Sequence, residues 1–168
     1  AHYRTEPYAR VLSNLIRSLD ATRIRGRVIV LPMANFPAGM AGTRTSPIDG
    51  GNLNRSFPGD PDGTVTQQIA WYITSELLPM VDAVVDLHSG GSALMDVPSV
   101  LARRPVEPAK AALSLRLLKA FAAPLAYLPA GGQGTGDDRT LSGAAALHGV
   151  VSLGSELGGS GTPTPAAL

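Results

Sequence analysis

The sequence alternates between two hydrophobic periods, and this alternation limits the possible folds more than any other feature. Residues 6–19 and 64–80 place apolar side chains every three to four positions, as amphipathic helices do. Residues 27–35, 83–88 and 150–155 are short apolar runs with many β-branched residues, which predict buried strands. Strands separated by helices indicate an α/β domain with a mostly parallel or mixed sheet flanked by helices.

The remaining segments complete this pattern. Two more helices are predicted over residues 108–121 and 138–148. Residues 36–63, which follow the first predicted strand, are dense in Gly, Pro, Asn and Asp and predict a long loop. Loops of about 25 residues inside a compact domain are usually functional. This loop is therefore expected to contribute to a binding or active site.

Composition narrows the class of partner. The 168 residues are 44% hydrophobic, and the 14 basic and 13 acidic side chains are interspersed, with a formal net charge of +1. Such a chain can bury a core, but it lacks the long-range electrostatic field that binding to nucleic acids or membrane surfaces needs. We therefore expect a small-molecule partner. Without cysteine, any metal site must use histidine and carboxylates. No secretion signal or membrane-length apolar run occurs, and we expect a cytoplasmic location.

Polar residues gather where the three predicted strands end, which is where ligands bind in open parallel sheets. The first strand leads into a loop with Arg44, Asn54 and Arg55, the second ends at His88, and the third ends at Glu156. From position alone, His88 is either a metal ligand or a hydrogen-bonded structural residue. Glu156 is either a general base tuned by burial or a carboxylate that accepts backbone hydrogen bonds.

The loop arginines also allow two interpretations. Arg44 and Arg55 could both be solvated, but Asn54 beside Arg55 offers an amide that would help the guanidinium hold a carboxylate. A serine hydrolase is disfavoured because no Gly-x-Ser-x-Gly elbow is present. A phosphate-binding loop is disfavoured because Lys110 and Lys119 both lie on a predicted helix.

Three motifs in order carry a resemblance to a known family. They are DGGNLNRSFPG (residues 49–59), VVDLHSGG (84–91) and SELGGSGT (155–162). Together they resemble the succinylglutamate desuccinylase/aspartoacylase family of zinc-dependent amidohydrolases, and the loop is most similar to the N-acetyl-diaminobutyrate deacetylase branch. The resemblance runs from about residue 2 to the last residue. It implies a zinc carboxypeptidase-like core that hydrolyses the amide of a small N-acyl amino acid.

The resemblance also implies a role for each candidate residue. His88 would be a zinc ligand, and a His-x-x-Glu pair near the amino terminus would supply two more. Asn54 and Arg55 would bind the substrate carboxylate, and Arg44 would polarise the scissile carbonyl. Glu156 would take a proton from the attacking water and return it to the leaving amine.

The amino-terminal metal motif departs from the family pattern. His2 stands where the first ligand belongs, but Thr5 stands where the glutamate belongs, and Glu6 follows one residue later. Either Glu6 reaches the metal through a shift in register, or the site has two protein ligands and binds zinc weakly. His2 itself is either a ligand or a terminal residue without a fixed position.

Two functions therefore remain open. Residues 1–168 are expected to form a single catalytic-type α/β domain that lacks the first strand and the carboxyl-terminal β-rich region of the family. A missing strand would leave unpaired backbone, so we expect a homo-oligomer or another chain to cover it. The chain is either a zinc-dependent deacylase or, as Thr5 favours, a catalytically inactive binding module with an incomplete metal site.

Overall fold

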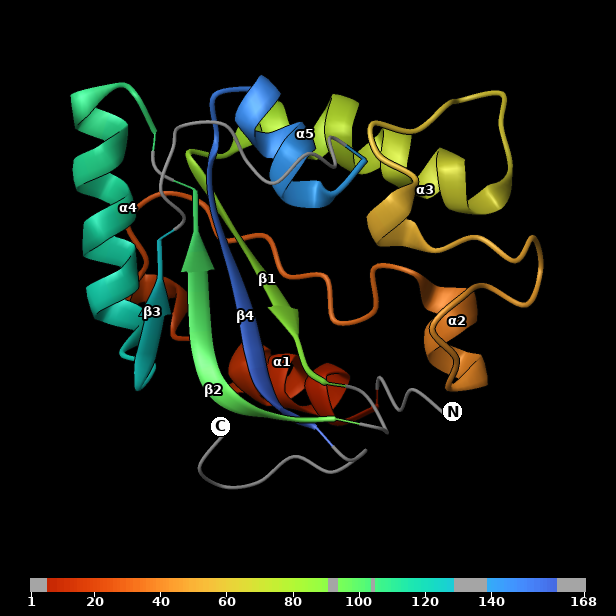
Figure 1. The fold of residues 1–168 in the computed structure, drawn as a ribbon, viewed down its shortest axis with the longest axis horizontal. Coiled ribbons are helices and arrows are strands. Elements are labelled where there is room, and N and C mark those ends of the chain that lie inside the picture. Colours follow the sequence, from red (N-terminus) through yellow and green to blue (C-terminus); the bar gives the residue numbers. More distant parts are fainter. Residues whose placement is uncertain (1–5, 91–93, 104, 129–138, 160–168) are drawn as a thin grey trace.

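A mixed four-stranded sheet forms the centre of the computed structural model, which describes residues 6–90, 94–103, 105–128 and 139–159 (Figure 1). The strands, in spatial order, are β1 (Ala83–His88), β4 (Val151–Gly159), β2 (Met95–Ala102) and β3 (Leu125–Tyr127). β1 pairs with β4 and β2 with β3 in parallel, whereas β2 and β4 are antiparallel. The predicted α/β class with a mixed sheet is confirmed.

Helices lie at the sides of this sheet (Figure 1). They are α1 (Glu6–Ser18), α2 (Phe36–Ala41), α3 (Val65–Tyr72), α4 (Pro108–Phe121) and α5 (Leu141–Leu147). The α3 helix continues through a π-helical turn, Ile73–Leu77, and a 3₁₀ turn, Leu78–Met80. Among the described residues, no helix is long and apolar enough to cross a membrane.

The core has two parts, one on each side of β4. In the first, α4 packs on β2 and β4 through Leu118, Val100 and Leu153, all of which are buried. In the second, α5 packs against the continuation of α3, and its members are Phe57, Ala70, Ile73, Leu78, Ala144, Ala145 and Val150. Small residues on α5 allow this close approach, since Ala144 and Ala145 are completely buried.

Several sequence predictions are confirmed. The strand over residues 83–88 and the helix over 108–121 have the predicted bounds, and α1 begins at the predicted residue. The helix predicted over residues 138–148 is present as α5 but is shorter. It begins at Leu141 because Thr140 caps it: the Thr140 Oγ1 accepts a hydrogen bond from the Gly143 N–H at 3.1 Å. Strand β4 extends to Gly159, beyond the predicted end at residue 155.

The predicted strand over residues 27–35 is wrong. Residues 27–31 pair with no strand in the described part of the chain, and apolar side chains there are exposed, with 53% exposure for Val28 and 43% for Leu31. β-Branched residues favour an extended backbone, but a strand also needs a neighbour that accepts its hydrogen bonds. Consequently only one of the three predicted strand ends, that of β1 at His88, is a strand end in the structure, since β4 continues past Glu156 to Gly159.

Strand β2 was not predicted, and Pro98 explains why. A proline within an apolar run argues against a central strand, because it cannot donate a ladder hydrogen bond. In the structure β2 lies between β4 and β3, and its pairing with β4 is interrupted between Asp96 and Ser99, where Pro98 falls. The irregularity accommodates the proline without ending the strand.

Candidate active site

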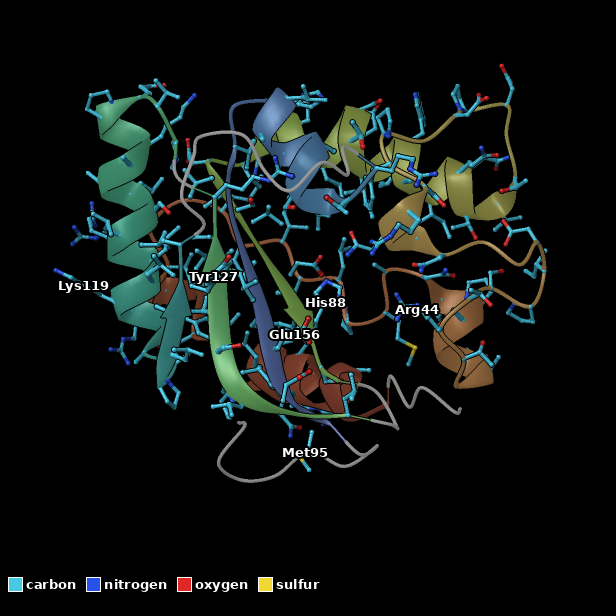
Figure 2. All side chains as sticks on the ribbon, in the orientation of Figure 1. Arg44, His88, Met95, Lys119, Tyr127 and Glu156 are labelled. Atoms are coloured by element: carbon cyan, nitrogen blue, oxygen red, sulfur yellow. The ribbon has the colours of Figure 1, made fainter. Side chains whose placement is uncertain are left out.

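Parallel pairing of β1 with β4 brings His88 and Glu156 together. The two residues are partners in the strand register, so their side chains leave the same face of the sheet (Figure 2). His88 is the last residue of β1, whereas Glu156 lies within β4, three residues before its end. An imidazole and a carboxylate therefore stand side by side where the sheet meets the loop that follows α2.

Asp86 orients the His88 ring from within the same strand. Residues two apart on a strand share a face, and the His88 Nε2 lies 2.7 Å from Asp86 Oδ2. Burial alone would lower the pKa of His88, but the hydrogen bond to Asp86 and the charges of Asp86 and Glu156 outweigh it and raise that pKa. With Nε2–H donating to the carboxylate, the ring presents Nδ1, which makes no hydrogen bond within the described part of the chain.

Glu156 is placed to exchange a proton. Burial raises its pKa, while the positive charges of His88 and Arg44 act in the opposite direction. A carboxylate with a raised pKa is a better proton acceptor near neutral pH than a fully solvated one.

Arg44 supplies positive charge to the same region from the loop after α2 (Figure 2). Its positive charge opposes the rise in pKa of both His88 and Glu156, so it lies within electrostatic range of the pair. The loop begins where Gly42 ends α2 in the left-handed conformation, with φ of 64°, which glycine adopts without a steric penalty.

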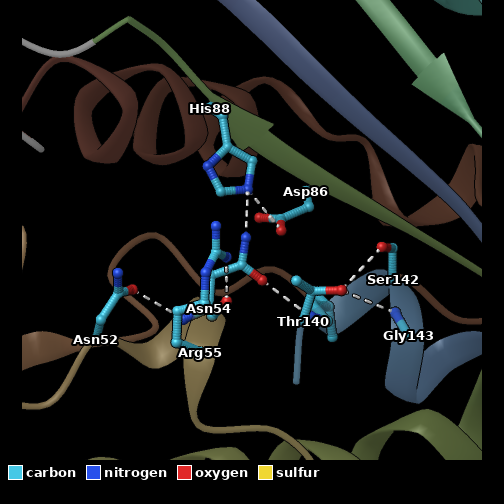
Figure 3. Close-up of polar contacts among 9 residues, drawn as sticks. Asn52, Asn54, Arg55, Asp86, His88, Thr140, Ser142 and Gly143 are labelled. Carbon is cyan, nitrogen blue, oxygen red and sulfur yellow. Dashed lines mark hydrogen bonds and ion pairs between the residues drawn. The ribbon is translucent and has the colours of Figure 1, made fainter. Parts of the chain in front are cut away.

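The Asn54–Arg55 pair approaches the site on a short 3₁₀ turn, Leu53–Arg55 (Figure 3). Asn52 caps this turn, since its Oδ1 accepts from the Asn54 N–H at 3.2 Å. The Asn54 Oδ1 accepts from the Leu141 N–H at 2.9 Å, and its Nδ2 lies 3.5 Å from His88 Nε2. Arg55 is exposed, and its Nη1 donates to the Asn54 carbonyl oxygen.

Asp49 fixes the beginning of this turn to α3. Its Oδ2 accepts from the Thr66 N–H at 2.7 Å, and its Oδ1 accepts from Thr66 Oγ1 at 2.8 Å and from the Gly51 N–H at 2.9 Å. Thr66 is fully buried, so its side of this contact is shielded from water. These hydrogen bonds, led by that of the Thr66 N–H, hold the pKa of Asp49 well below its usual range.

The structure thus brings four of the predicted site residues into one region: His88, Glu156, Asn54 and Arg44. Arg55 lies beside Asn54 on the same turn. The two remaining predicted ligands are not tested. His2 lies outside the described residues. Glu6 is the first residue of α1, but the structure describes only its backbone. Figures 1 and 3 both draw α1 near the end of β1.

Two contributors were missed by sequence reasoning. The Asp-Gly-Gly pattern at residues 49–51 signals a local turn, but nothing in the sequence links Asp49 to Thr66, 17 positions later. Leu141 participates only through its backbone N–H, so its side chain carries no signal of that role.

Within the described residues, no group of three or more histidine, aspartate or glutamate side chains is arranged to hold a metal ion. His88 by itself has the form of a metal ligand, because a carboxylate holds one ring nitrogen and the other makes no hydrogen bond to a described residue.

Several known proteins are similar to this chain in sequence and fold. The N-alpha-acetyl-L-2,4-diaminobutyric acid deacetylase of Halomonas elongata is 45% identical over 157 residues, which cover 94% of this chain and 45% of that protein. The product-bound ectoine utilization protein EutE (DoeB) of Ruegeria pomeroyi has a TM-score of 0.82 at 42% identity. The succinylglutamate desuccinylase/aspartoacylase of Rhodobacter sphaeroides has a TM-score of 0.85 at 36% identity.

Each of these two structures is matched over 99% of this chain and 49% of its own length. The chain therefore spans about half the length of the relatives that it matches. The model of the succinylglutamate desuccinylase/aspartoacylase catalytic domain covers residues 7–168. This near-complete coverage shows that the chain belongs to the succinylglutamate desuccinylase/aspartoacylase family.

Proposed function

We propose that this chain supplies the catalytic half of a zinc-dependent amidohydrolase that removes the acyl group from a small N-acyl amino acid. The observation that carries the proposal is the register pairing of His88 with Glu156, with the ring of His88 held by Asp86. N-acetyl-L-2,4-diaminobutyrate is the substrate to test first, because the 45% identical relative from Halomonas elongata is a deacetylase of that compound.

His88 fits a zinc site as one ligand through Nδ1. His2, which stands at the first position of the family's amino-terminal ligand motif, and Glu6 would complete the set. Because Thr5 occupies the glutamate position of that motif, Glu6 would reach the metal through a shift of one residue in register. Asp86 contributes by keeping the proton on Nε2, which leaves the Nδ1 lone pair for a cation. A bound zinc ion would supply Lewis acidity toward water and the acyl carbonyl.

Residues of the chain itself would transfer the proton, stabilise the developing charge and bind the substrate. Glu156, whose raised pKa suits proton exchange near neutral pH, would take the proton of the attacking water and deliver it to the leaving amine. Arg44 would stabilise negative charge on the carbonyl oxygen as it develops. Asn54 and Arg55 would hold the substrate carboxylate, and this would align the amide with Glu156.

The test is zinc stoichiometry of the purified protein by elemental analysis, in parallel with deacetylation assays. We expect about one zinc per chain, lost in His88→Ala and kept in His148→Ala. His148 is a matched control because it is exposed at the end of α5. Activity should disappear with a chelator and return with zinc. Zinc that persists in His88→Ala would contradict the proposal, and a protein that binds no zinc would indicate a binding module instead.

A further inference from the structure

The side-chain amide of Asn54 has only one orientation that its surroundings allow. The Leu141 N–H lies 2.9 Å from one end of the amide. His88 Nε2 lies 3.5 Å from the other end (Figure 3). A backbone N–H can only donate, so the atom that faces Leu141 must be the amide oxygen. The amino group of Asn54 therefore faces the side of the site where His88 lies.

His88 cannot accept a hydrogen bond from that amino group. Its Nε2 donates to Asp86 Oδ2 at 2.7 Å, and a ring nitrogen that carries a hydrogen has no lone pair left to accept one. The 3.5 Å approach from Asn54 is therefore a contact of two donors. Among the described residues the amino group of Asn54 has no acceptor, although the residue is half-buried. An anionic oxygen from a ligand would satisfy it.

Leu141 is a rigid partner for Asn54. It is the first residue of α5, and the helix is anchored by the complete burial of Ala144 and Ala145. A second link joins the same two segments, because the Phe57 N–H donates to the Arg139 carbonyl oxygen at 3.2 Å and Phe57 is 3% exposed. The start of α5 therefore cannot shift without disturbing the core.

We infer that Leu141 is a positioning residue for substrate binding. The Leu141 N–H holds the side-chain oxygen of Asn54 away from the site. The Asn54 amide therefore presents the two N–H bonds of its amino group to the site and no acceptor. A flipped amide would instead place its oxygen against the substrate carboxylate and repel it. The inference rests on the proposed function, in which Asn54 binds that carboxylate.

A proline substitution tests the inference, because proline is tolerated at the first position of a helix yet lacks the N–H. The backbone of Thr140, with φ of −99° and ψ of 160°, is compatible with a following proline. Leu141→Ala is the matched control. Both variants lose a side chain that packs against the core, but only Leu141→Pro loses the hydrogen bond to Asn54.

With zinc-loaded protein, we expect KM for N-acetyl-L-2,4-diaminobutyrate to be about tenfold higher in Leu141→Pro than in Leu141→Ala. The kcat values of the two should agree within about twofold, since the lost contact acts on binding. Equal KM values, or a loss confined to kcat, would overturn the inference.

Two Asn54 variants separate this inference from the proposed function. If Asn54→Ala leaves KM unchanged, Asn54 does not bind substrate and the proposed role of that residue fails. If Asn54→Ala raises KM while Leu141→Pro matches Leu141→Ala, only the inference fails.

Hydrogen exchange gives a readout without turnover. The Leu141 amide should be protected in the wild type and in Asn54→Asp, and should exchange faster in Asn54→Ala. An unprotected amide in the wild type would also overturn the inference.

Discussion

The two sides of the candidate site are held in place by different kinds of interaction. His88 and Glu156 are register partners on parallel strands, so the backbone ladder between β1 and β4 sets their separation. Asn54 lies on a 3₁₀ turn, and a single hydrogen bond from Leu141, 87 positions later, sets the orientation of its side chain. Backbone pairing fixes one side, and side-chain hydrogen bonds fix the other.

This difference predicts how each side responds to substitution. On the strand side, an isosteric change should alter the chemistry and leave the geometry intact, because the ladder does not involve side chains. On the loop side, the loss of one polar side chain should alter geometry and stability together. The following substitutions test this contrast.

Glu156→Gln should have the largest effect. Glutamine keeps the shape of the side chain but cannot accept the proton of water, so we expect kcat to fall about 10²- to 10⁴-fold. Zinc content should be unchanged. Steady-state kinetics beside Glu107→Gln, an exposed glutamate that pairs with Lys110 at 3.0 Å, provides the comparison. An unfolded or zinc-free Glu156→Gln protein would show that the strand side is not fixed by its backbone.

Asp86→Asn should weaken zinc binding about 10- to 100-fold, as loss of a carboxylate behind a histidine ligand commonly does. The asparagine can still contact His88 Nε2 but no longer carries the charge that stabilises the N–H tautomer. Competition with a chelator measures the affinity, and Asp62→Asn, at an exposed loop position, is the control. Equal affinities in the two variants would remove Asp86 from the metal site.

Asp49→Ala should destabilise the loop side by about 1 kcal/mol, the usual cost of losing a helix-capping side chain. Because the folded state holds the pKa of Asp49 below its ordinary value, the stabilisation is present above about pH 4 and is lost as the pH falls. Urea unfolding at neutral and acidic pH should therefore show a difference between wild type and variant that shrinks in acid. A difference that is the same at both pH values would contradict this account.

Val28→Ser should have the smallest effect, within about 0.5 kcal/mol, because the side chain is 53% exposed and its segment pairs with no strand among the described residues. The matched substitution is Val151→Ser in β4, where the side chain is 2% exposed and a loss of more than about 2 kcal/mol is expected. Chemical denaturation compares the two. A large loss in Val28→Ser would indicate that residues 27–31 are buried against another strand.

The strand side of the site could be predicted from the sequence because its signals are local. The run from Ala83 to His88 is apolar and β-branched, ends at a polar residue and is followed by glycines, and the structure gives the strand the same bounds. Glu156 ends a similar apolar run. The helices predicted between the two strands favour their parallel arrangement, and the pairing of β1 with β4 makes neighbours of His88 and Glu156.

The loop side could be predicted only in part. The identities of Asn54 and Arg55 pointed to carboxylate binding, but the partners that orient Asn54 and anchor Asp49 come from segments far along the chain. Residues 27–31 fail for the same reason, since their composition favours an extended backbone and cannot specify a pairing partner. What the sequence does not specify in each case is a long-range hydrogen bond.

The position of β4 in the sheet has a consequence for biosynthesis. Of the four strands described, β4 is the last to be synthesised, yet β1 pairs only with it and the β2–β3 pair joins β1 only through it. A nascent chain that has emerged as far as α5 therefore carries β1 without the one strand that pairs with it among the described residues. Unpaired strand edges invite aggregation, and contacts between distant segments form slowly. Glu156 meets His88 only after the ribosome has released β4, so the candidate site and the protected edge of β1 form in the same step.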